Sequence, residues 1–466
     1  ELLCGLFFFL AYYLYLGNTR ISKTLAIVCM TIAVFSKEMA AALPLVLIAH
    51  EVYYSDREIP IVSTIVKGIR KTIPFIVVAA LPLLLKYAVL KNQQGSAGYP
   101  GDTPWESIVI MSGVFLKYCR LVLLPLRQCA DYVVGAEHAV AAPAGLLLFI
   151  VLAVYLRKFG KTGGFTLAFF LLSLLPVSNI IPFGETMAER YLYIPMFALS
   201  LGLATVADRW SAKRIAIIPA VAILIFLTVL TTNRLWVWKS DYDLWGDTTI
   251  CAPSSAEAWM NLGNAYLKRD DPSKALEMYA RVPDCETEYE EAKHHYNIGL
   301  ALVRLGDSEN ALDSFLVSIE ADSQFLQSYY HAGSILGAMG EAEKGLRYLE
   351  RAIEVNGEVA LSHYIAANYA MRYFVDPERN GKAVAWLERA VKLDPASGLY
   401  LGALGQAYFR IGKIKQAEDA LLGSIETDPD LVPSYMMLID IYSATGRTDR
   451  ALVIQHRLKV RTEESK

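Results

Sequence analysis

Cysteine is scarce in this chain, and its positions predict neither a metal site nor a redox site. The 466 residues include 6 cysteines, with no Cys-x-x-Cys pair and no metal-binding spacing, which argues against the zinc-binding and thioredoxin-like classes. Cys4, Cys29 and Cys119 lie in apolar runs, where we expect buried thiols. Cys251 and Cys285 are free to pair in an oxidising compartment, and the sequence leaves that pairing open.

Charged residues are also few. Charged residues make up 20% of the chain and the net charge is -3, so no basic excess indicates a nucleic-acid partner. The chain has no initiator methionine and no basic leader before its first apolar run. We therefore expect a fragment whose N-terminal part is missing.

Long apolar runs, by contrast, fill the first half of the chain, whose mean hydropathy overall is +0.33. A membrane-spanning helix needs about 20 apolar residues. The runs around which such helices could form are Leu2–Leu16, Thr24–Tyr53, Ile73–Leu90, Leu146–Leu156, Phe165–Leu175, Tyr191–Val206 and Ile215–Leu230. Because Ser36-Lys37-Glu38 interrupts Thr24–Tyr53, this run is either one long helix or two short helices that meet at those charges.

Basic segments orient these helices, because lysine and arginine concentrate in cytoplasmic loops. Three such segments hold Arg57, Lys67, Arg70 and Lys71, then Arg157, Lys158 and Lys161, then Arg209, Lys213 and Arg214. An even number of crossings must separate the first segment from the second, and the runs Ile73–Leu90 and Leu146–Leu156 already supply two. We therefore expect Ile108–Leu126, in which Lys117 and Arg120 share one helix face, to lie in the interface. This topology leaves the C-terminal half outside the cytoplasm.

The stretch Pro176–Pro195 is the most unusual of the polar breaks. Prolines and a glycine interrupt it, and Glu185, Glu189 and Arg190 follow where hydrocarbon gives way to headgroups. Charge at that depth is costly and is usually paired or functional. The alternatives are a polar loop with one interfacial Glu–Arg pair and a functional site. The prolines, glycine and framing tyrosines favour the functional site.

The expected topology brings further charged residues to the same membrane face. Arginine and lysine at headgroup level can hold a lipid-linked phosphate through charge-assisted hydrogen bonds. We interpret Arg234, Trp236 and Trp238 as ordinary interfacial anchors. The candidate residues for binding a lipid-linked donor are Lys37, Glu38, Lys117, Arg120, Asp131, Glu185, Glu189 and Arg190.

One pattern of small and large residues recurs six times after residue 255. Its first two copies are Trp259, Leu262, Gly263, Tyr266, Ala275 and Tyr279, then His295, Ile298, Gly299, Leu302, Ala311 and Phe315. This is the spacing of a tetratricopeptide repeat, a helical hairpin of about 34 residues. Six such hairpins stack into a right-handed solenoid with a concave groove. In the fourth, we expect a lengthened turn around Val375–Gly381.

Repeats of this kind usually bind peptide segments. Asn261, Asn264 and Asn297 fall on the groove-lining first helices and could hydrogen-bond a bound backbone; the alternative is a solvated or packing role. This half has no Ser-His-Asp set, metal pattern or phosphate loop, so we expect a binding module. The chain as a whole is predicted to be all-α, with a polytopic membrane domain at 1–238, a junction at 239–255 and six repeats at 256–464.

Several motifs resemble those of the transmembrane and tetratricopeptide-repeat O-mannosyltransferases, the TMTC family. They are Ser36-Lys37-Glu38 ahead of Pro44, Leu116–Pro125 followed by Asp131-Tyr132, Pro176–Asn179 leading to Ala188–Pro195, and Asn233-Arg234 with Trp238 and Leu244-Trp245. They keep the family order over nearly the whole chain, although each motif alone is short.

The resemblance implies a polytopic glycosyltransferase of the GT-C type. Such an enzyme moves a sugar, such as mannose, from a polyprenyl-phosphate carrier to serine or threonine hydroxyls of proteins. Lys37, Glu38, Glu189 and Arg190 match family motifs at the donor site, with Arg190 on the carrier phosphate. The family's catalytic acidic residues lie in an earlier loop, so no catalytic base is assigned here. The cations that stabilise the departing phosphate come from the protein or from a divalent metal.

Two other functions stay open on the sequence. One is a non-catalytic, membrane-anchored scaffold for envelope proteins, and the other is a ligase or polymerase of lipid-linked polysaccharide. The short loops favour a bacterial inner-membrane protein with periplasmic repeats; in a eukaryote the repeats would face the endoplasmic reticulum lumen. The expected partners are a polyprenyl-phosphate-linked sugar, the membrane and proteins bound in the repeat groove, and not nucleic acid.

Overall fold

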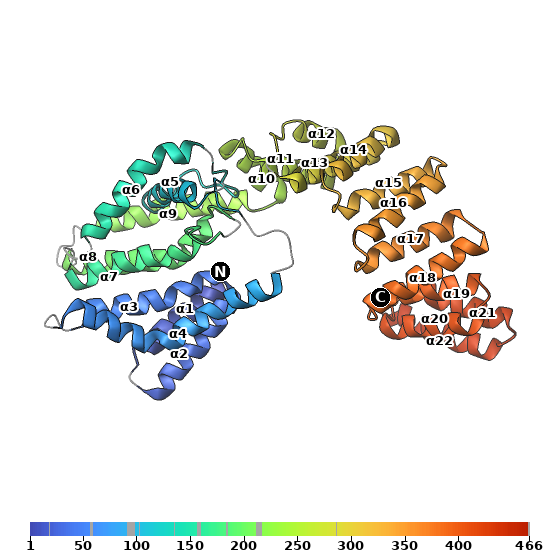
Figure 1. The fold of residues 1–466 in the computed structure, drawn as a ribbon, viewed down its shortest axis with the longest axis horizontal. Helices are drawn as coiled ribbons and strands as arrows, with labels where there is room; N and C mark the ends of the chain where they lie inside the picture. The colour runs from blue at the N-terminus through green and yellow to red at the C-terminus, as the bar shows by residue number, and fades with distance from the viewer. Residues whose placement is uncertain are drawn as a thin grey trace. The chain divides into compact units, whose positions relative to one another are not determined.

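The computed structural model describes residues 1–464 except 18, 56–58, 91–97, 102, 135, 156–159, 183–184, 211–216 and 286. The described residues form helices and no strand, which confirms the all-α prediction (Figure 1). The chain divides into two compact units, Glu1–Ala258 and Trp259–Lys466. Some of the basic residues expected to orient the helices lie outside the described residues, namely Arg57, Arg157, Lys158, Lys213 and Arg214.

The first unit is a set of packed helices. They are α1 (Leu2–Tyr15), α2 (Arg20–Ser36), α3 (Leu43–Tyr54), α4 (Ile61–Leu90), α5 (Pro104–Leu123), α6 (Ala136–Tyr155), α7 (Gly160–Ser173), α8 (Tyr193–Trp210), α9 (Ile217–Val237) and α10 (Asp241–Cys251), with the short 3-10 helices η1 (Glu38–Ala42), η2 (Leu175–Val177) and η3 (Glu189–Leu192). α1 packs on α2, and α3 packs on both α4 and α7. A single apolar core, which includes Phe8, Phe169 and Tyr191, joins α1–α5, α7 and α8.

The charged break at Lys37 divides the predicted run Thr24–Tyr53. α2 ends at Ser36, Lys37 is extended with φ -163° and ψ 136°, and η1 follows. Pro44 then lies in the first turn of α3, where a helix tolerates proline because the first N–H groups have no partner within the helix. Of the two alternatives, the structure therefore has the two short helices.

Two helices among the described residues are long and apolar enough to cross a membrane, at Gly160–Val177 and Ile218–Val237. α1 and α3 have 14 and 12 residues, or about 21 and 18 Å of helix, against a hydrocarbon core of about 30 Å. α5 packs closely on α6, where a Cβ on Gly145 would lie 1.8 Å from the Ser112 carbonyl oxygen. The number of crossings and the interfacial placement of α5 stay predictions.

The repeat region is a series of six helical hairpins (Figure 1). The pairs are α11 (Ala256–Lys268) with α12 (Pro272–Tyr279), α13 (Glu288–Leu305) with α14 (Ser308–Ala321), α15 (Leu326–Ala338) with α16 (Ala342–Val355), α17 (Ala360–Tyr373) with α18 (Pro377–Leu393), α19 (Gly398–Arg410) with α20 (Ile414–Thr427), and α21 (Val432–Ala444) with α22 (Thr448–Glu464). A Cβ on Gly263 would lie 2.2 Å from the Tyr279 ring, so glycine is what lets these two helices approach.

The fourth hairpin corrects the expectation of a lengthened turn around Val375–Gly381. α18 begins at Pro377, so most of that stretch is helical. The Asp376 carboxylate accepts a hydrogen bond of 2.9 Å from the Arg379 N–H, and Pro377 occupies the first turn. Both features favour a helix start, and the extra residues therefore lengthen α18.

Candidate functional site

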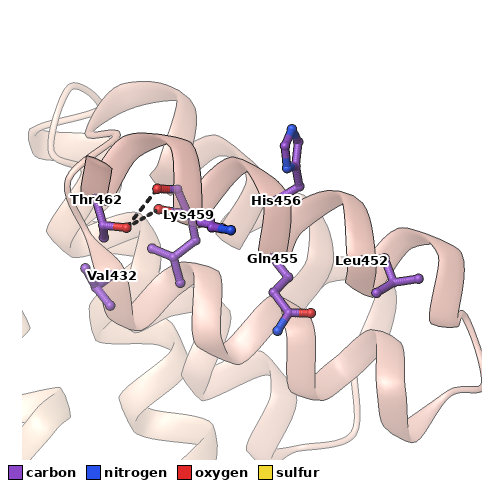
Figure 2. A pocket seen from close by; sticks show the side chains of 7 residues that line it. Val432, Leu452, Gln455, His456, Lys459 and Thr462 are labelled. Carbon is purple, nitrogen blue, oxygen red and sulfur yellow. Dashed lines mark hydrogen bonds between the residues drawn. The ribbon is translucent and has the colours of Figure 1, made fainter. Parts of the chain in front are cut away.

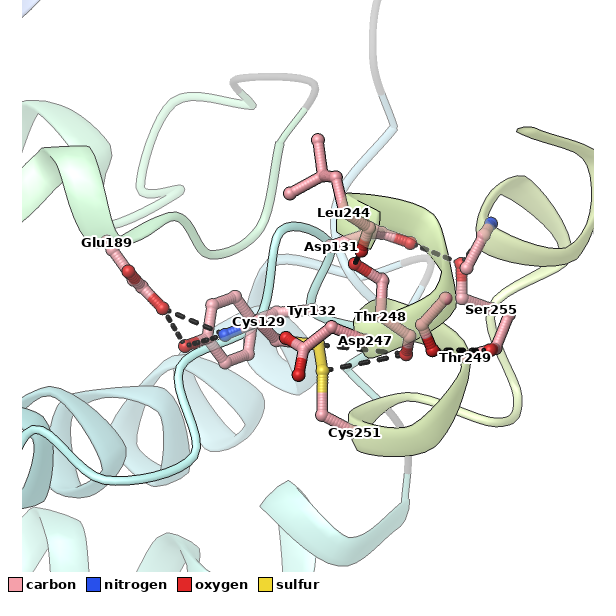
Figure 3. Close-up of a disulfide and its surroundings, with 12 residues drawn as sticks. Cys129, Asp131, Tyr132, Glu189, Leu244, Asp247, Thr248, Thr249, Cys251 and Ser255 are labelled. Carbon is pink, nitrogen blue, oxygen red and sulfur yellow. Dashed lines mark hydrogen bonds between the residues drawn. A yellow bond between two sulfur atoms is a disulfide. The ribbon is translucent and has the colours of Figure 1, made fainter. Parts of the chain in front are cut away.

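Glu189 and Arg190 are neighbours in η3 but bind different partners. Glu189 Oε1 accepts hydrogen bonds from the Tyr132 hydroxyl at 2.5 Å and from the Cys129 N–H at 2.9 Å (Figure 3). The Arg190 guanidinium donates to the Glu185 carboxylate. Successive side chains of a 3-10 helix point about 120° apart because it has three residues per turn. The Glu–Arg pair considered from the sequence therefore forms between Glu185 and Arg190, and Glu189 takes no part in it.

Arg190 and Lys37 converge although they are far apart in the sequence. Arg190 Nε lies 3.8 Å from Glu1 Oε1, and Lys37 Nζ lies 3.9 Å from the same oxygen. Lys37 Nζ also lies 3.9 Å from Glu38 Oε1. The structure thus brings together Lys37, Glu38, Glu185 and Arg190 from the predicted set. It places the two cations close enough to share one anionic oxygen.

Glu185 is held in its ionised form within this cluster. Burial alone would raise the pKa of its carboxyl group. The hydrogen bonds from Tyr191, at 2.6 Å, and from Arg190 outweigh burial, and with the charges of Arg190 and Lys37 they lower the pKa below its usual value. The Arg190 guanidinium is consequently oriented by a permanent negative charge.

The charge balance of the cluster limits what it can bind. The carboxylates of Glu1, Glu38 and Glu185 face the cations of Lys37 and Arg190. An anionic ligand must therefore displace a carboxylate, and Glu1 is the one that both cations approach. In the part of the chain that the structure describes, no group of three or more His, Cys, Asp or Glu is placed to hold a metal ion.

A disulfide anchors the loop that carries Tyr132. Cys129 is bonded to Cys251 at the end of α10 (Figure 3), and Cys285 is a free thiol. The pairing of Cys251 with Cys285, which the sequence left open, is therefore not formed. A signal for the true pair was present in the sequence, because Cys129 lies in the predicted outer loop and Cys251 follows the last predicted crossing, on the same side.

The other predicted donor residues lie apart from the cluster. Asp131 Oδ2 accepts a hydrogen bond of 2.5 Å from the Ser255 hydroxyl (Figure 3). The Lys117 ammonium lies 4.6 Å from the centre of the Tyr132 ring, and Arg120 is exposed on α5. Asp131 and Lys117 thus help to hold the loop after α5.

Arg234 makes a specific ion pair, which its interpretation as an interfacial anchor did not anticipate. Its Nη1 donates to Asp247 Oδ2 at 2.8 Å, and the side chain is 16% exposed. Its Nε and Nη2 are buried and have no hydrogen-bond partner among the described residues. Trp236 and Trp238 are 63% and 57% exposed, which suits an interfacial position.

The three predicted groove asparagines differ in their surroundings. Asn264 Oδ1 accepts a hydrogen bond of 2.6 Å from the Tyr279 hydroxyl, which ties the two helices of its hairpin together. Asn261 is half-buried on the same helix. Asn297 is 5% exposed, and its Nδ2 has no hydrogen-bond partner in the described part of the chain. Asn297 therefore carries an unused donor, but a buried one.

An open hollow lies at the last hairpin, away from all of these asparagines (Figure 2). It is lined by side chains of α21 and α22, namely Val432, Leu452, Gln455, His456, Leu458, Lys459 and Thr462. None of the predicted site residues lines it. The hollow thus adds nothing to the candidate donor site.

Comparison with known families defines the class of the second half. Models of the tetratricopeptide repeat match residues 258–282, 292–325, 326–358 and 371–432. The C-terminal half is therefore built of tetratricopeptide repeats, which confirms the prediction from residue spacing.

Two curated proteins are similar to parts of the chain. The chain is 22% identical over 216 residues to the protein O-mannosyl-transferase TMTC3 of Mus musculus, a match that covers 42% of this chain and 23% of the mouse protein. It is 32% identical over 75 residues to the general transcriptional corepressor ssn6 of Schizosaccharomyces pombe, covering 16% of this chain and 7% of that protein. The match to TMTC3 thus spans about a quarter of that relative.

Solved structures are similar to part of the chain. The crystal structure of MamA shares 19% identity, covers 36% of this chain and 96% of MamA, and has a TM-score of 0.33. The crystal structure of YrrB, a TPR protein with an unusual peptide-binding site, shares 17% identity over 42% of this chain and 98% of YrrB, also with a TM-score of 0.33.

Proposed function

We propose that the protein is an integral-membrane glycosyltransferase of the GT-C type. It transfers a sugar from a polyprenyl-phosphate carrier to serine or threonine hydroxyls of proteins. The motif resemblance to the TMTC family and the similarity to a protein O-mannosyl-transferase support this reaction and favour mannose as the sugar.

One observation carries the proposal: Lys37 and Arg190 converge on a single carboxylate oxygen of Glu1. A phosphate oxygen can take the place of that oxygen, because both groups are anionic acceptors of charge-assisted hydrogen bonds. Arg190 then holds the carrier phosphate and stabilises the charge that develops as it leaves. Glu185 and Tyr191 orient Arg190 for this role.

Membrane insertion is supported by exposed apolar surface on several helices. Ile218, Leu224 and Ile225 on α9 are 73%, 63% and 60% exposed, and exposed apolar area of this extent is unfavourable in water. The Cys129–Cys251 disulfide supports an oxidising compartment for the loop after α5 and the end of α10. Both fit the topology in which the donor site and the repeats face away from the cytoplasm.

The repeat region binds the acceptor protein in this proposal. Tetratricopeptide solenoids present a concave surface on which their first helices are exposed. The unused Nδ2 donor of Asn297 is suited to a peptide carbonyl, provided that the groove opens around it.

The test is sugar transfer in membranes from cells that express the complete gene. Polyprenyl-phosphate donors carrying different sugars are added, and serine and threonine residues of envelope proteins are analysed by mass spectrometry. Donor-dependent glycosylation of protein hydroxyls is the expected result. Glycan-linked product would identify a polysaccharide ligase or polymerase instead. If the protein binds envelope proteins but transfers sugar from none of the donors, it is a scaffold.

A further inference from the structure

Basic residues gather at one end of the helices α1–α4 and α7. They lie where α1 and α3 end and where α2, α4 and α7 begin, and are Arg20, Lys23, Lys67, Arg70, Lys71 and Lys161. Among the side chains that the structure describes in these five helices, Glu51 is the one carboxylate at this end. Glu1 and Glu38 lie at the opposite end, beside Arg190 and Lys37.

We propose that this basic end binds the phosphate of an anionic phospholipid. Lys67, Lys71 and Lys161 hold the headgroup, and the apolar flank of α4 contacts the acyl chains. The inference rests on the proposed function, which places the protein in a membrane. It concerns the membrane face opposite to the donor cluster, which is formed by Lys37, Glu38, Glu185 and Arg190. Lysine-rich segments next to a membrane helix attract the anionic lipids of the cytoplasmic leaflet.

The last turn of α3 brings two of these lysines together. Lys71 Nζ of α4 donates to Glu51 Oε2 at 2.7 Å, and Lys161 Nζ of α7 donates to the Ser55 carbonyl at 3.2 Å. Glu51 and Ser55 are four residues apart, so they lie on one face of the helix, one turn from each other. α4 and α7 therefore deliver an ammonium each to the same face of α3.

Glu51 orients this site and leaves donors for a ligand. Its Oε1 accepts a hydrogen bond of 2.9 Å from the Tyr15 hydroxyl and its Oε2 accepts from Lys71, so both oxygens are engaged. An ammonium has three N–H donors. The single hydrogen bond that Lys71 makes to Glu51, and that Lys161 makes to Ser55, therefore leaves further donors on each. Lys67 is exposed one turn before Lys71 on α4.

The apolar surface that follows the lysines along α4 points to a lipid. Val77, Leu81 and Leu85 are 57%, 39% and 50% exposed. They lie beyond Lys71, away from the basic end, and on the side of the helix that carries Lys67, because 3.6 residues make one turn. A nucleic acid or an acidic soluble protein would leave these apolar side chains in water. A phospholipid fits both parts of the surface, because its phosphate contacts the lysines and its acyl chains contact the apolar side chains that follow them.

The experiment compares Lys67→Gln/Lys161→Gln with wild type in phosphatidylcholine nanodiscs that contain phosphatidylglycerol as the minor lipid. Native mass spectrometry counts the phosphatidylglycerol molecules that each protein retains. Loss of two cations should weaken phosphatidylglycerol binding about 30-fold, with phosphatidylcholine retention unchanged. Lys71 is kept in the variant so that Glu51 does not lose its partner. Arg347→Gln/Lys415→Gln, which removes two exposed cations from the repeat region, is the matched control and should bind like wild type.

Equal retention of phosphatidylglycerol by wild type and Lys67→Gln/Lys161→Gln would overturn the lipid site. An equal loss in the control variant would also overturn it, because the effect would then be one of net charge. Failure of the protein to enter nanodiscs of any composition would contradict membrane insertion and hence the proposed function. Insertion without selective retention would contradict the lipid site alone.

Discussion

Tyr132 donates a hydrogen bond of 2.5 Å to Glu189, and this contact joins the loop after α5 to η3. Burial raises the pKa of the Tyr132 phenol, and the hydrogen bond to Glu189 raises it further, so the phenol keeps its proton and remains a donor. Glu189 thereby fixes the backbone beside Arg190, whose guanidinium turns to Glu185. We infer that Glu189 positions Arg190 and does not itself contact the donor.

Removing the Tyr132 hydroxyl should destabilise the first unit. Tyr132→Phe should lower the free energy of unfolding by about 1.5–3 kcal/mol, because a hydrogen bond to a charged group is lost. Denaturant unfolding of the detergent-solubilised protein, followed by tryptophan fluorescence, measures this. Tyr13→Phe is the control, since Tyr13 is 72% exposed, and its effect should stay within about 0.5 kcal/mol. Equal stabilities of the two variants would contradict the role given to Tyr132.

The disulfide makes a prediction about chemical labelling. Without reductant, Cys129 and Cys251 should resist alkylation and appear as one cross-linked peptide in mass spectrometry. Because the bond closes a loop with a sequence separation of 122, reduction should lower the free energy of unfolding by up to about 4–5 kcal/mol. Cys285→Ser should leave both results unchanged. Free alkylation of Cys129 in the native, unreduced protein would show that the pairing is wrong.

Glu418 makes the stability of the repeat region depend on pH. Burial alone would raise the pKa of its carboxyl group, but hydrogen bonds from Tyr442, Arg447 and Arg450, at 2.8, 2.5 and 2.9 Å, lower the pKa below its ordinary value. The depressed pKa gives stability that is fully present above the unfolded value and is lost as the pH falls through the folded value. The fifth and sixth repeats should therefore weaken on acidification below about pH 4.5.

Substitution of Glu418 tests that dependence. Glu418→Gln should cost about 2–3 kcal/mol at pH 7, because charge-assisted hydrogen bonds are lost, and it should flatten the fall in stability at acid pH. Calorimetric unfolding at pH 4 and pH 7 measures both effects. Glu426→Gln, which removes an exposed carboxylate from the same helix, should retain the wild-type pH dependence. A parallel fall for wild type and Glu418→Gln would rule out Glu418 as the source.

Two glycines should respond oppositely to alanine. A Cβ on Gly299 would lie 2.7 Å from the Phe315 ring, so Gly299→Ala should destabilise the second repeat by about 1–3 kcal/mol through overpacking. Gly381 lies inside α18 with nothing within 4 Å of an added Cβ. Gly381→Ala should therefore stabilise the protein by about 0.5–1 kcal/mol. Thermal unfolding of the two variants compares these effects. A Gly299→Ala variant more stable than wild type would contradict the close approach of α13 and α14 at Gly299.

The repeats were predictable because their requirements are local. Each hairpin repeats the same small and large positions, as at Gly263 and Tyr279, and each copy reports on the same packing. The break at Lys37 was predictable for a similar reason, since its charges interrupt an apolar run. The start of α18 was missed because the cap at Asp376 and the proline that follows it were interpreted as part of a turn.

The partners in the donor cluster were not predictable in the same way. The sequence places Glu189 beside Arg190, but the 3-10 turn of η3 directs them to Tyr132 and Glu185. Which side chain meets which depends on how distant segments pack, and spacing along the chain does not carry that information. The Cys129 disulfide was missed for the same reason, although the predicted topology already placed both cysteines on one side.

The role of Arg190 in holding the carrier phosphate is tested most directly by the rate of sugar transfer by Arg190→Ala in membranes that contain the complete protein. If Arg190 holds the carrier phosphate, the rate should fall by about 100-fold or more, as when one preorganised donor to a developing anion is removed. Arg347→Ala, an exposed arginine of α16, should transfer at the wild-type rate. Wild-type transfer by a folded Arg190→Ala variant would contradict the assignment of the donor site.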